Sequence, residues 1–184
     1  MNENFIKVKR NEGRENIPTA FIFSCPGQEE MKSGKLVNGQ TGKNLDMMLE
    51  FLHNSRPDIF PSVDRYDYRI TNSSEIVHFK AHDNRTEPKT SEICETDNIK
   101  RLCADISGFK YVITFGRCSA IASKVLTEQG LCADITFMYS QHLSFLSLNS
   151  SIKNDINGCP IERGSKDSTR KRLEVAAWKI LEQL

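Results

Sequence analysis

Residues 19–27 read TAFIFSCPG, a short apolar run that ends in a Pro-Gly bend. A run of about 4–8 residues rich in Ile, Phe and Thr is typical of a buried β-strand. Similar runs follow at 66–72 (YDYRITN), 111–115 (YVITF) and 134–139 (DITFMY). The sequence therefore predicts four strands, of which the first spans residues 19–25.

Helical patterns lie between and after these strands. Apolar side chains recur at one-face spacing in four segments: 45–52, 99–106, 121–126 and 167–184. The last segment begins with Asp167 and Ser168, which are suitable N-cap residues, and we expect it to cover the second face of the sheet. Alternation of strands and helices predicts an α/β fold: a three-layer α/β/α sandwich around a four-stranded, mostly parallel sheet.

Length and charge limit the function classes. The chain has 184 residues with 25 Lys+Arg and 24 Asp+Glu, which gives a formal net charge of +1. This length suits one domain over 1–184, with a motif-bearing core at about 18–150 and a C-terminal helix at about 167–184. The balanced charge excludes a protein that coats nucleic acid through overall positive charge, so any DNA contact must come from a local patch.

Several features predict a cytoplasmic protein that does not contact membranes. No stretch approaches the ~18–20 consecutive apolar residues that a membrane helix needs. The start of the chain, MNENFIKVKRNEGREN, is charged where a signal peptide would be apolar. The six cysteines are far apart without a C-x-x-C pair, which predicts reduced and mostly buried thiols.

Three polar loops follow predicted strands and are the expected location of a functional site. Ligands of open parallel sheets bind beyond the carboxyl ends of the strands. The loop at 26–40 is long for a compact domain, and the loop at 73–89 is equally long and polar. The loop after the fourth strand holds Ser140, Gln141, His142, Leu143, Ser144, Phe145 and Leu146.

The first strand and its loop carry a resemblance to a known family. Residues 23–30 (FSCPGQEE), 34–42 (GKLVNGQTG) and 45–49 (LDMML) are similar to the uracil-DNA glycosylase superfamily, and most similar to its family 4-like branch. Further blocks follow in the same order: 70–72 (ITN), Asn84-Arg85-x-x-Pro88, 112–120 (VITFGRCSA) and 141–144 (QHLS). The resemblance covers about residues 18–150.

The resemblance implies roles for individual residues. His142 would donate a hydrogen bond to the pyrimidine O2, Asn72 would read the base edge, and the Pro26-Gly27 bend would approach the sugar and phosphate. Glu30 is our candidate for handling the attacking water. The remaining expected substrate contacts are Ser24, Cys25, Gln28 and Val37. Outside the resemblance, these residues also fit ordinary loop, turn and solvated surface positions.

This chain departs from the family pattern at three places. Ser24 and Cys25 stand where relatives have carboxylates or Ala, and Val37 stands where the family has a stacking Phe. We therefore expect a roomier, less aromatic pocket that admits a bulkier pyrimidine. The N-terminal cysteine pair of the family's iron–sulfur cluster is missing and Val77 stands near the third ligand, so Cys94 alone cannot hold a cluster. We expect no metal and no cofactor.

DNA contacts are expected from two regions. After His142 the family's loop enters the minor groove, which makes Leu146 an apolar wedge flanked by Ser144 and Phe145; core packing is the alternative. Arg85 is a further candidate contact. The basic stretch 163–172 (RGSKDSTRKR) either contacts phosphates or is an ordinary solvated helix start.

The leading hypothesis is a monofunctional DNA glycosylase that hydrolyses the N-glycosidic bond of a flipped-out pyrimidine and leaves an abasic site. We expect a modified cytosine, such as a hypermodified base of a phage genome, which would make the protein a defence enzyme. One alternative is an ordinary uracil-DNA glycosylase of base excision repair. The other is a catalytically inactive module that binds DNA or a base. We expect a monomer.

Overall fold

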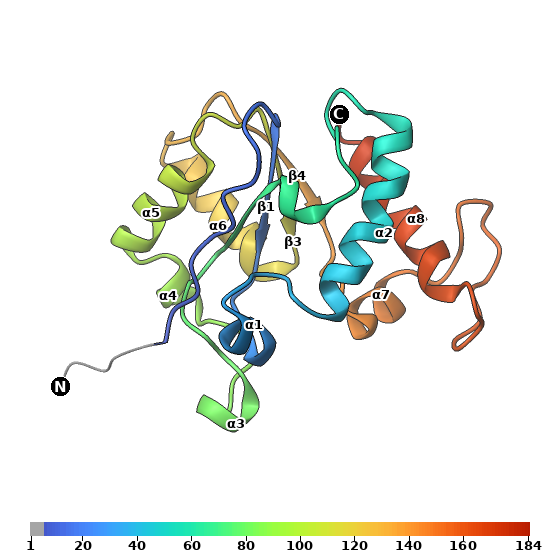
Figure 1. Cartoon of the computed structure of the whole chain (residues 1–184), viewed down its shortest axis with the longest axis horizontal. Coiled ribbons are helices and arrows are strands. Elements are labelled where there is room, and N and C mark those ends of the chain that lie inside the picture. The colour runs from blue at the N-terminus through green and yellow to red at the C-terminus, as the bar shows by residue number, and fades with distance from the viewer. Residues whose placement is uncertain (1–5) are drawn as a thin grey trace.

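The protein was analysed as a computed structural model that describes residues 6–184. The first five residues, part of the charged start considered above, lie outside the described residues. Four strands form a central sheet with helices on both sides (Figure 1). In chain order the elements are β1 (Thr19–Phe23), α1 (Gln28–Ser33), α2 (Gln40–Ser55), the 3-10 turn η1 (Arg65–Asp67), β2 (Arg69–Asn72), α3 (Lys80–Asp83), α4 (Thr90–Ile93), α5 (Thr96–Ile106), β3 (Tyr111–Phe115), α6 (Arg117–Glu128), β4 (Thr136–Ser140), α7 (Phe145–Ser151) and α8 (Ser168–Leu181).

All strand pairs of the sheet are parallel, and their order is β2-β1-β3-β4. The central strand β1 sets the register, because Phe21 lies opposite Ile70 of β2 and Ile113 of β3. The chain leaves β1 toward β2 on one side and returns to β3 on the other. The carboxyl ends of β1 and β3 therefore flank the point where ligands of open α/β sheets bind.

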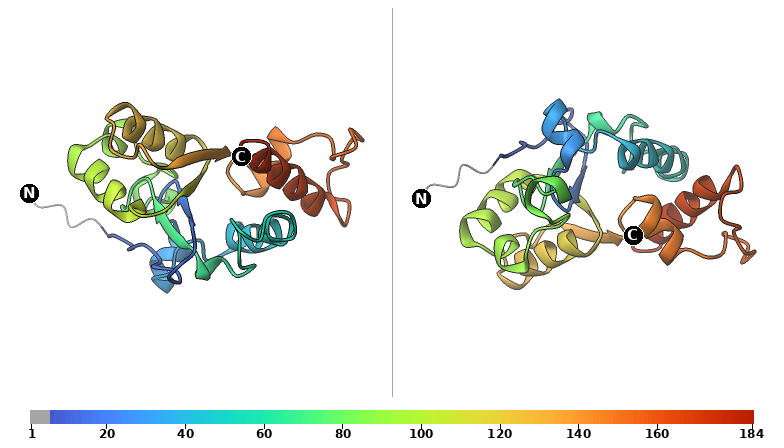
Figure 2. Two further views of the ribbon diagram at one scale, coloured as in Figure 1. Left: turned by 90° about the horizontal axis from the view of Figure 1, so that it is seen from above. Right: turned by 90° about the horizontal axis from the view of Figure 1, so that it is seen from below.

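The two faces of the sheet bury separate apolar cores, which confirms the predicted α/β/α sandwich. Helices α2 and α8 cover one face, and α5 and α6 cover the other (Figure 2). Alternate residues of β1 point to opposite faces: Phe21 and Phe23 pack toward α2 and α8, whereas Ala20 and Ile22 pack toward α5 and α6. The last helix covers the second face as predicted.

Three strands differ from the prediction in their bounds. The first strand ends at Phe23, and the fourth runs over Thr136–Ser140. The second begins only at Arg69, because the Asp64 carboxylate accepts the Tyr66 N–H at 2.9 Å and starts a 3-10 turn. A local hydrogen bond from an Asp side chain outweighs the strand preference of Tyr66.

The predicted loops contain short helices. Helix α1 lies in the 26–40 segment, α3 in the 73–89 segment, and α7 begins directly after Ser144. The predicted N-cap of the last helix is also revised: Asp167 occupies the cap position, but its side chain accepts no capping hydrogen bond. Among residues 6–184, no helix combines the length and apolar character needed to cross a membrane.

Arg172 belongs to the basic stretch 163–172, yet it is a core residue. Its side chain is only 2% exposed. The guanidinium donates to the carbonyls of Ile152 at 3.0 Å, Ser168 at 3.0 Å and Ile161 at 3.1 Å. It joins the segment between α7 and α8 to the last helix, so it is not available to contact phosphate.

Replacing Arg172 with Leu is predicted to lower the free energy of unfolding by about 3 kcal/mol, since each buried acceptor left unpaired costs ~1–3 kcal/mol. Chemical denaturation measures this loss. The control is Arg170→Leu, which removes only a half-exposed pair with Glu50 and should cost less than ~1 kcal/mol. Equal losses for the two variants would contradict a structural role for Arg172.

Candidate functional site

A cavity of about 650 Å³ opens at the carboxyl edge of the sheet. Its size falls within the ~300–1,000 Å³ range of small-molecule pockets. The ends of all four strands contribute to it, together with α1, α7 and the segment after β2. The lining residues that the following paragraphs use are Phe23, Ser24, Cys25, Gly27, Glu30, Val37, Asn72, Glu87, Phe115, Gly116, Arg117, Cys118, Tyr139, Gln141, His142, Ser144, Leu146, Ser147, Ser150 and Ser151.

His142 follows β4 and is held in one orientation. The next residue, Leu143, is fully buried, and its carbonyl accepts a hydrogen bond from the Asn44 side chain of α2 at 2.7 Å. The Ser144 N–H donates to Nδ1 of His142 at 3.1 Å. Because Nδ1 accepts this bond, the neutral imidazole carries its proton on Nε2 and is a hydrogen-bond donor there.

The surroundings of His142 favour its neutral form. Burial lowers the pKa of His142 below its usual value, and the negative charge of Glu87 opposes part of that shift. The Phe23 ring lies edge-on to the imidazole at a centroid distance of 6.2 Å. A Cβ added to Gly116 would lie 3.2 Å from Cβ of His142, and Gly116 has a φ of +86°, so this position requires glycine.

Asn72 is the last residue of β2 and is 4% exposed. Arg101 of α5 donates to its backbone carbonyl at 2.8 Å. This contact fixes the strand end while the amide side chain lines the cavity. The amide offers both a donor and an acceptor to a bound polar group.

The segment after β1 is attached to the segment after β2 by four hydrogen bonds. The Ser24 carbonyl accepts from the Ser73 hydroxyl at 2.6 Å and from the Ser74 N–H at 3.1 Å. The Phe23 carbonyl accepts from the Ser73 N–H, and the Pro26 carbonyl accepts from the His78 N–H. The Pro-Gly bend is therefore held in place beside the end of β2.

Glu30 faces the cavity from the first turn of α1. Its Oε2 accepts the Gly27 N–H at 3.0 Å, and burial raises its pKa. Val37 also lines the cavity, with a φ of +53° that is rare for a β-branched residue. A Cβ added to Gly42 would lie 2.0 Å from the Val37 carbonyl, so the close approach of α2 to this strained residue requires glycine.

Cys25 and Cys118 are neutral thiols in the wall of the cavity. Burial raises the pKa of Cys25 to about 12. Burial also raises the pKa of Cys118. A neutral thiol is a poor nucleophile, so neither group is suited to covalent catalysis at neutral pH.

Aromatic surface comes from the strands rather than from the loop that carries Val37. Phe23 and Phe115 stack with ring centroids 4.6 Å apart and planes inclined by 18°. Both line the cavity, as does Tyr139, which is 49% exposed. Because Phe23 is 3% exposed and Phe115 is fully buried, Tyr139 supplies most of the accessible aromatic surface of the cavity.

Helix α7 presents a row of hydroxyls to the cavity. Ser144 caps this helix by accepting the Ser147 N–H at 3.3 Å. Ser147, Ser150 and Ser151 lie on the same wall. Leu146, in the first turn, is 83% exposed at the rim.

Four expected site residues lie outside the lining. Pro26 is buried beneath the bend, and Gln28 is exposed on α1. Phe145 is 46% exposed but does not border the cavity. Arg85 is held by Asp83 and Glu92 in salt bridges of 3.1 Å and 2.9 Å.

Sequence reasoning gave no role to several polar residues of the lining, among them Glu87, Arg117 and Gln141. Arg117 is exposed at the first position of α6, directly after the end of β3, so the strand-end rule was sufficient to find it. Gln141 is adjacent to His142, and within the described residues its buried Nε2 has no hydrogen-bond partner. No local pattern marks Glu87.

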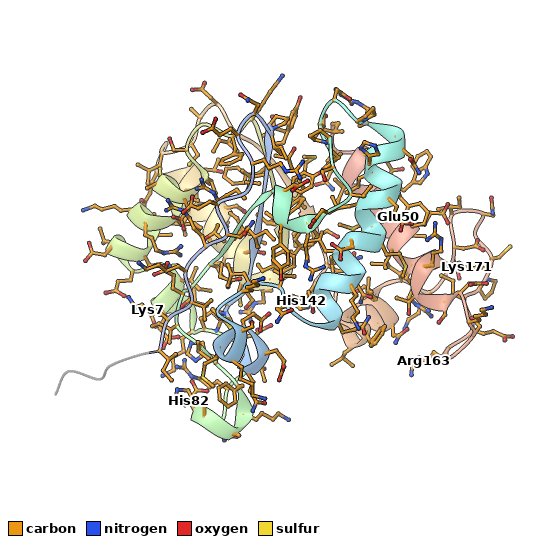
Figure 3. The ribbon with its side chains drawn as sticks, viewed as in Figure 1. Lys7, Glu50, His82, His142, Arg163 and Lys171 are labelled. Atoms are coloured by element: carbon orange, nitrogen blue, oxygen red, sulfur yellow. The ribbon has the colours of Figure 1, made fainter. Side chains whose placement is uncertain are left out.

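Figure 3 shows His142 at the end of the sheet beside α1 and α7, with Arg163 and Lys171 well to one side. The basic stretch that includes them therefore does not border the cavity. Cys94 is exposed, and among residues 6–184 no three His, Cys, Asp or Glu side chains gather as a metal site.

Comparisons with protein-family models and with curated proteins give no match. The function must therefore be argued from the site itself.

The pKa of His142 is predicted to lie below the ordinary value of about 6.5, because burial disfavours the imidazolium. An NMR titration of the His142 ring measures it. Unfolded His142 takes up its proton at higher pH than the folded form, so stability falls as the pH drops below about 6.5 toward the folded pKa.

The control for this titration is Glu87→Gln, which removes the charge that opposes the shift. The His142 pKa should fall further in this variant. A His142 midpoint at or above the ordinary value in the wild-type protein would contradict the burial argument.

Proposed function

We propose that the protein is a monofunctional DNA glycosylase that removes a modified pyrimidine from DNA. One observation supports this most strongly: an amide, an imidazole N–H donor and a Pro-Gly bend, which come from three distant segments, border one cavity large enough for a nucleobase. Asn72, His142 and Gly27 supply these groups. The family resemblance of the sequence points to the same chemistry.

The chemistry requires what this site offers. Cleavage of a base–sugar bond builds negative charge on the departing base and positive charge on the deoxyribose. The Nε2–H of His142 would donate to the pyrimidine O2 as that charge develops, and the Asn72 amide would bind the base edge. No lysine is among the residues that line the cavity, which favours hydrolysis by water over a lyase reaction.

A bulky modified cytosine fits the walls of the cavity better than plain uracil. Tyr139, which is 49% exposed at the end of β4, offers an aromatic surface for a base, and the buried stack of Phe23 and Phe115 supports the sheet end beside it. The hydroxyls of Ser147, Ser150 and Ser151 offer hydrogen bonds to a polar substituent, such as the sugar of a glucosylated hydroxymethylcytosine. Activity on such a base would indicate defence against phages, whereas activity on uracil would indicate repair.

DNA would be held at the rim of the cavity. Leu146 is the exposed apolar side chain that would fill the space left by the extruded base. Arg117, exposed on the same rim, would contact a phosphate. The enzyme would act as a monomer.

The direct test is abasic-site formation on oligonucleotides that carry uracil, hydroxymethylcytosine or glucosylated hydroxymethylcytosine. The glucosylated base is predicted to be the best substrate. His142→Ala should slow its removal by about 10²–10⁴-fold and Asn72→Ala by about 10²-fold, as expected for the loss of groups that act on a developing charge. His82→Ala, on the exposed helix α3, is the control that should retain the rate.

Each outcome of this screen has a definite meaning. Removal of uracil alone would replace the modified-base proposal with ordinary repair. Binding of DNA without abasic sites on any substrate would support the inactive binding module. Unchanged rates in both His142→Ala and Asn72→Ala would refute the proposed active site.

Arg117→Gln is predicted to weaken DNA binding to a similar extent for all sequences, and to reduce the slope of log affinity against log salt concentration by about 1. Binding titrations over a range of salt concentrations measure this. The control is Lys124→Gln, a charge removed from the same helix away from the cavity. An unchanged slope in Arg117→Gln would exclude a phosphate contact.

A further inference from the structure

Two carboxylates border the cavity, and the structure holds them in different ways. Glu30 is engaged with its own helix, because its Oε2 accepts the Gly27 N–H in the first turn of α1. Glu87 borders the cavity from another segment, between α3 and α4. Glu87 is exposed to solvent, where water is available to it.

The short segment that carries Glu87 is fixed by the two residues that precede it. Before it, Arg85 pairs with Asp83 and makes two hydrogen bonds of 2.9 Å to the carboxylate of Glu92. The Thr86 carbonyl accepts a weak hydrogen bond from the Cys25 thiol, with the sulfur 3.6 Å away. Because Cys25 follows β1, this contact attaches the segment to the centre of the site. An exposed side chain is thereby presented from a restrained backbone.

Glu87 also influences the groups that line the cavity. Its negative charge raises the pKa of His142, whereas burial lowers that pKa by a larger amount. Burial raises the pKa of Cys118, and the charge of Glu87 raises it further. Arg85, two residues before it in the chain, is already paired, so it does not neutralise this carboxylate.

We propose that Glu87, rather than Glu30, is the general base for the attacking water; this inference rests on the proposed glycosylase function. The C1′–N bond breaks and its electron pair leaves with the base. The water oxygen forms the new bond to C1′, and Glu87 accepts the proton that this oxygen releases. The base anion, stabilised by the His142 N–H, takes a proton from solvent, and Glu87 releases its proton to solvent, so one water is consumed in each cycle.

This assignment gives the two carboxylates different roles. Glu30 is a positioning residue that keeps the Gly27 bend in place through its hydrogen bond. Glu87 has the mobility of an exposed side chain and access to water, both of which a proton acceptor needs. His142 acts on the base, on the other side of the bond that breaks.

Single-turnover rates of abasic-site formation test the assignment, with enzyme in excess of the oligonucleotide and well above the dissociation constant of the complex. Glu87→Gln should lower the rate by about 10²-fold without loss of DNA affinity, since a missing general base affects the chemical step. Glu29→Gln is the matched control, because Glu29 is exposed on α1 and lies outside the cavity lining. Thermal unfolding of both variants checks that the fold is retained.

Chemical rescue separates a proton acceptor from a structural residue. Added formate should restore part of the rate of Glu87→Ala, because a small carboxylate can occupy the vacated space, and it should not accelerate Glu30→Ala. A wild-type rate in Glu87→Gln would overturn the assignment, as would a slow Glu87→Ala that formate does not rescue. Either result leaves the proposed function intact when the wild-type enzyme forms abasic sites. A wild-type protein that forms none would refute both proposals.

Discussion

Parallel pairing of β1 with both β2 and β3, and of β3 with β4, constrains the rest of the molecule. Parallel strands end at the same edge of a sheet, so residues far apart in the chain meet there without any sequence proximity. This constraint explains the positions of Asn72, Gly116 and His142, because each lies at or just beyond a strand end. The apolar cores on both faces fix the register, and with it the relative positions of these groups.

The second constraint is electrostatic. The cavity combines a neutral imidazole, two neutral thiols and two carboxylates, with the cation of Arg117 at its rim. Such a site is poorly suited to bind phosphate in its interior. It is better suited to a neutral base inside and the DNA backbone outside. His142 carries its proton on Nε2 because its Nδ1 accepts a hydrogen bond from the Ser144 N–H. The start of α7 therefore sets the imidazole tautomer, and the same helix carries the serine hydroxyls that line the cavity.

The fold was predictable from local patterns, whereas only part of the site was. Short β-branched and aromatic runs and helical periodicity were sufficient for the three layers. The strand-end rule indicated the loops that border the site, and the resemblance to known glycosylases pointed to Asn72 and His142. Glu87 depends on contacts such as Thr86 with Cys25, 61 residues apart, which no local pattern encodes. Arg172 was wrongly grouped with surface cations, because its burial is created by carbonyls of the preceding loop.

The central claim is that a target base binds in the cavity at the carboxyl edge of the sheet. The most direct measurement is a crystal structure of the protein with duplex DNA whose target nucleotide carries a 2′-fluoro group that blocks cleavage. The account predicts that the base lies outside the stack, between the ends of β2 and β4, within hydrogen-bond distance of the Asn72 amide and Nε2 of His142. A base that remains stacked in the duplex, or DNA bound to another face of the protein, would contradict it.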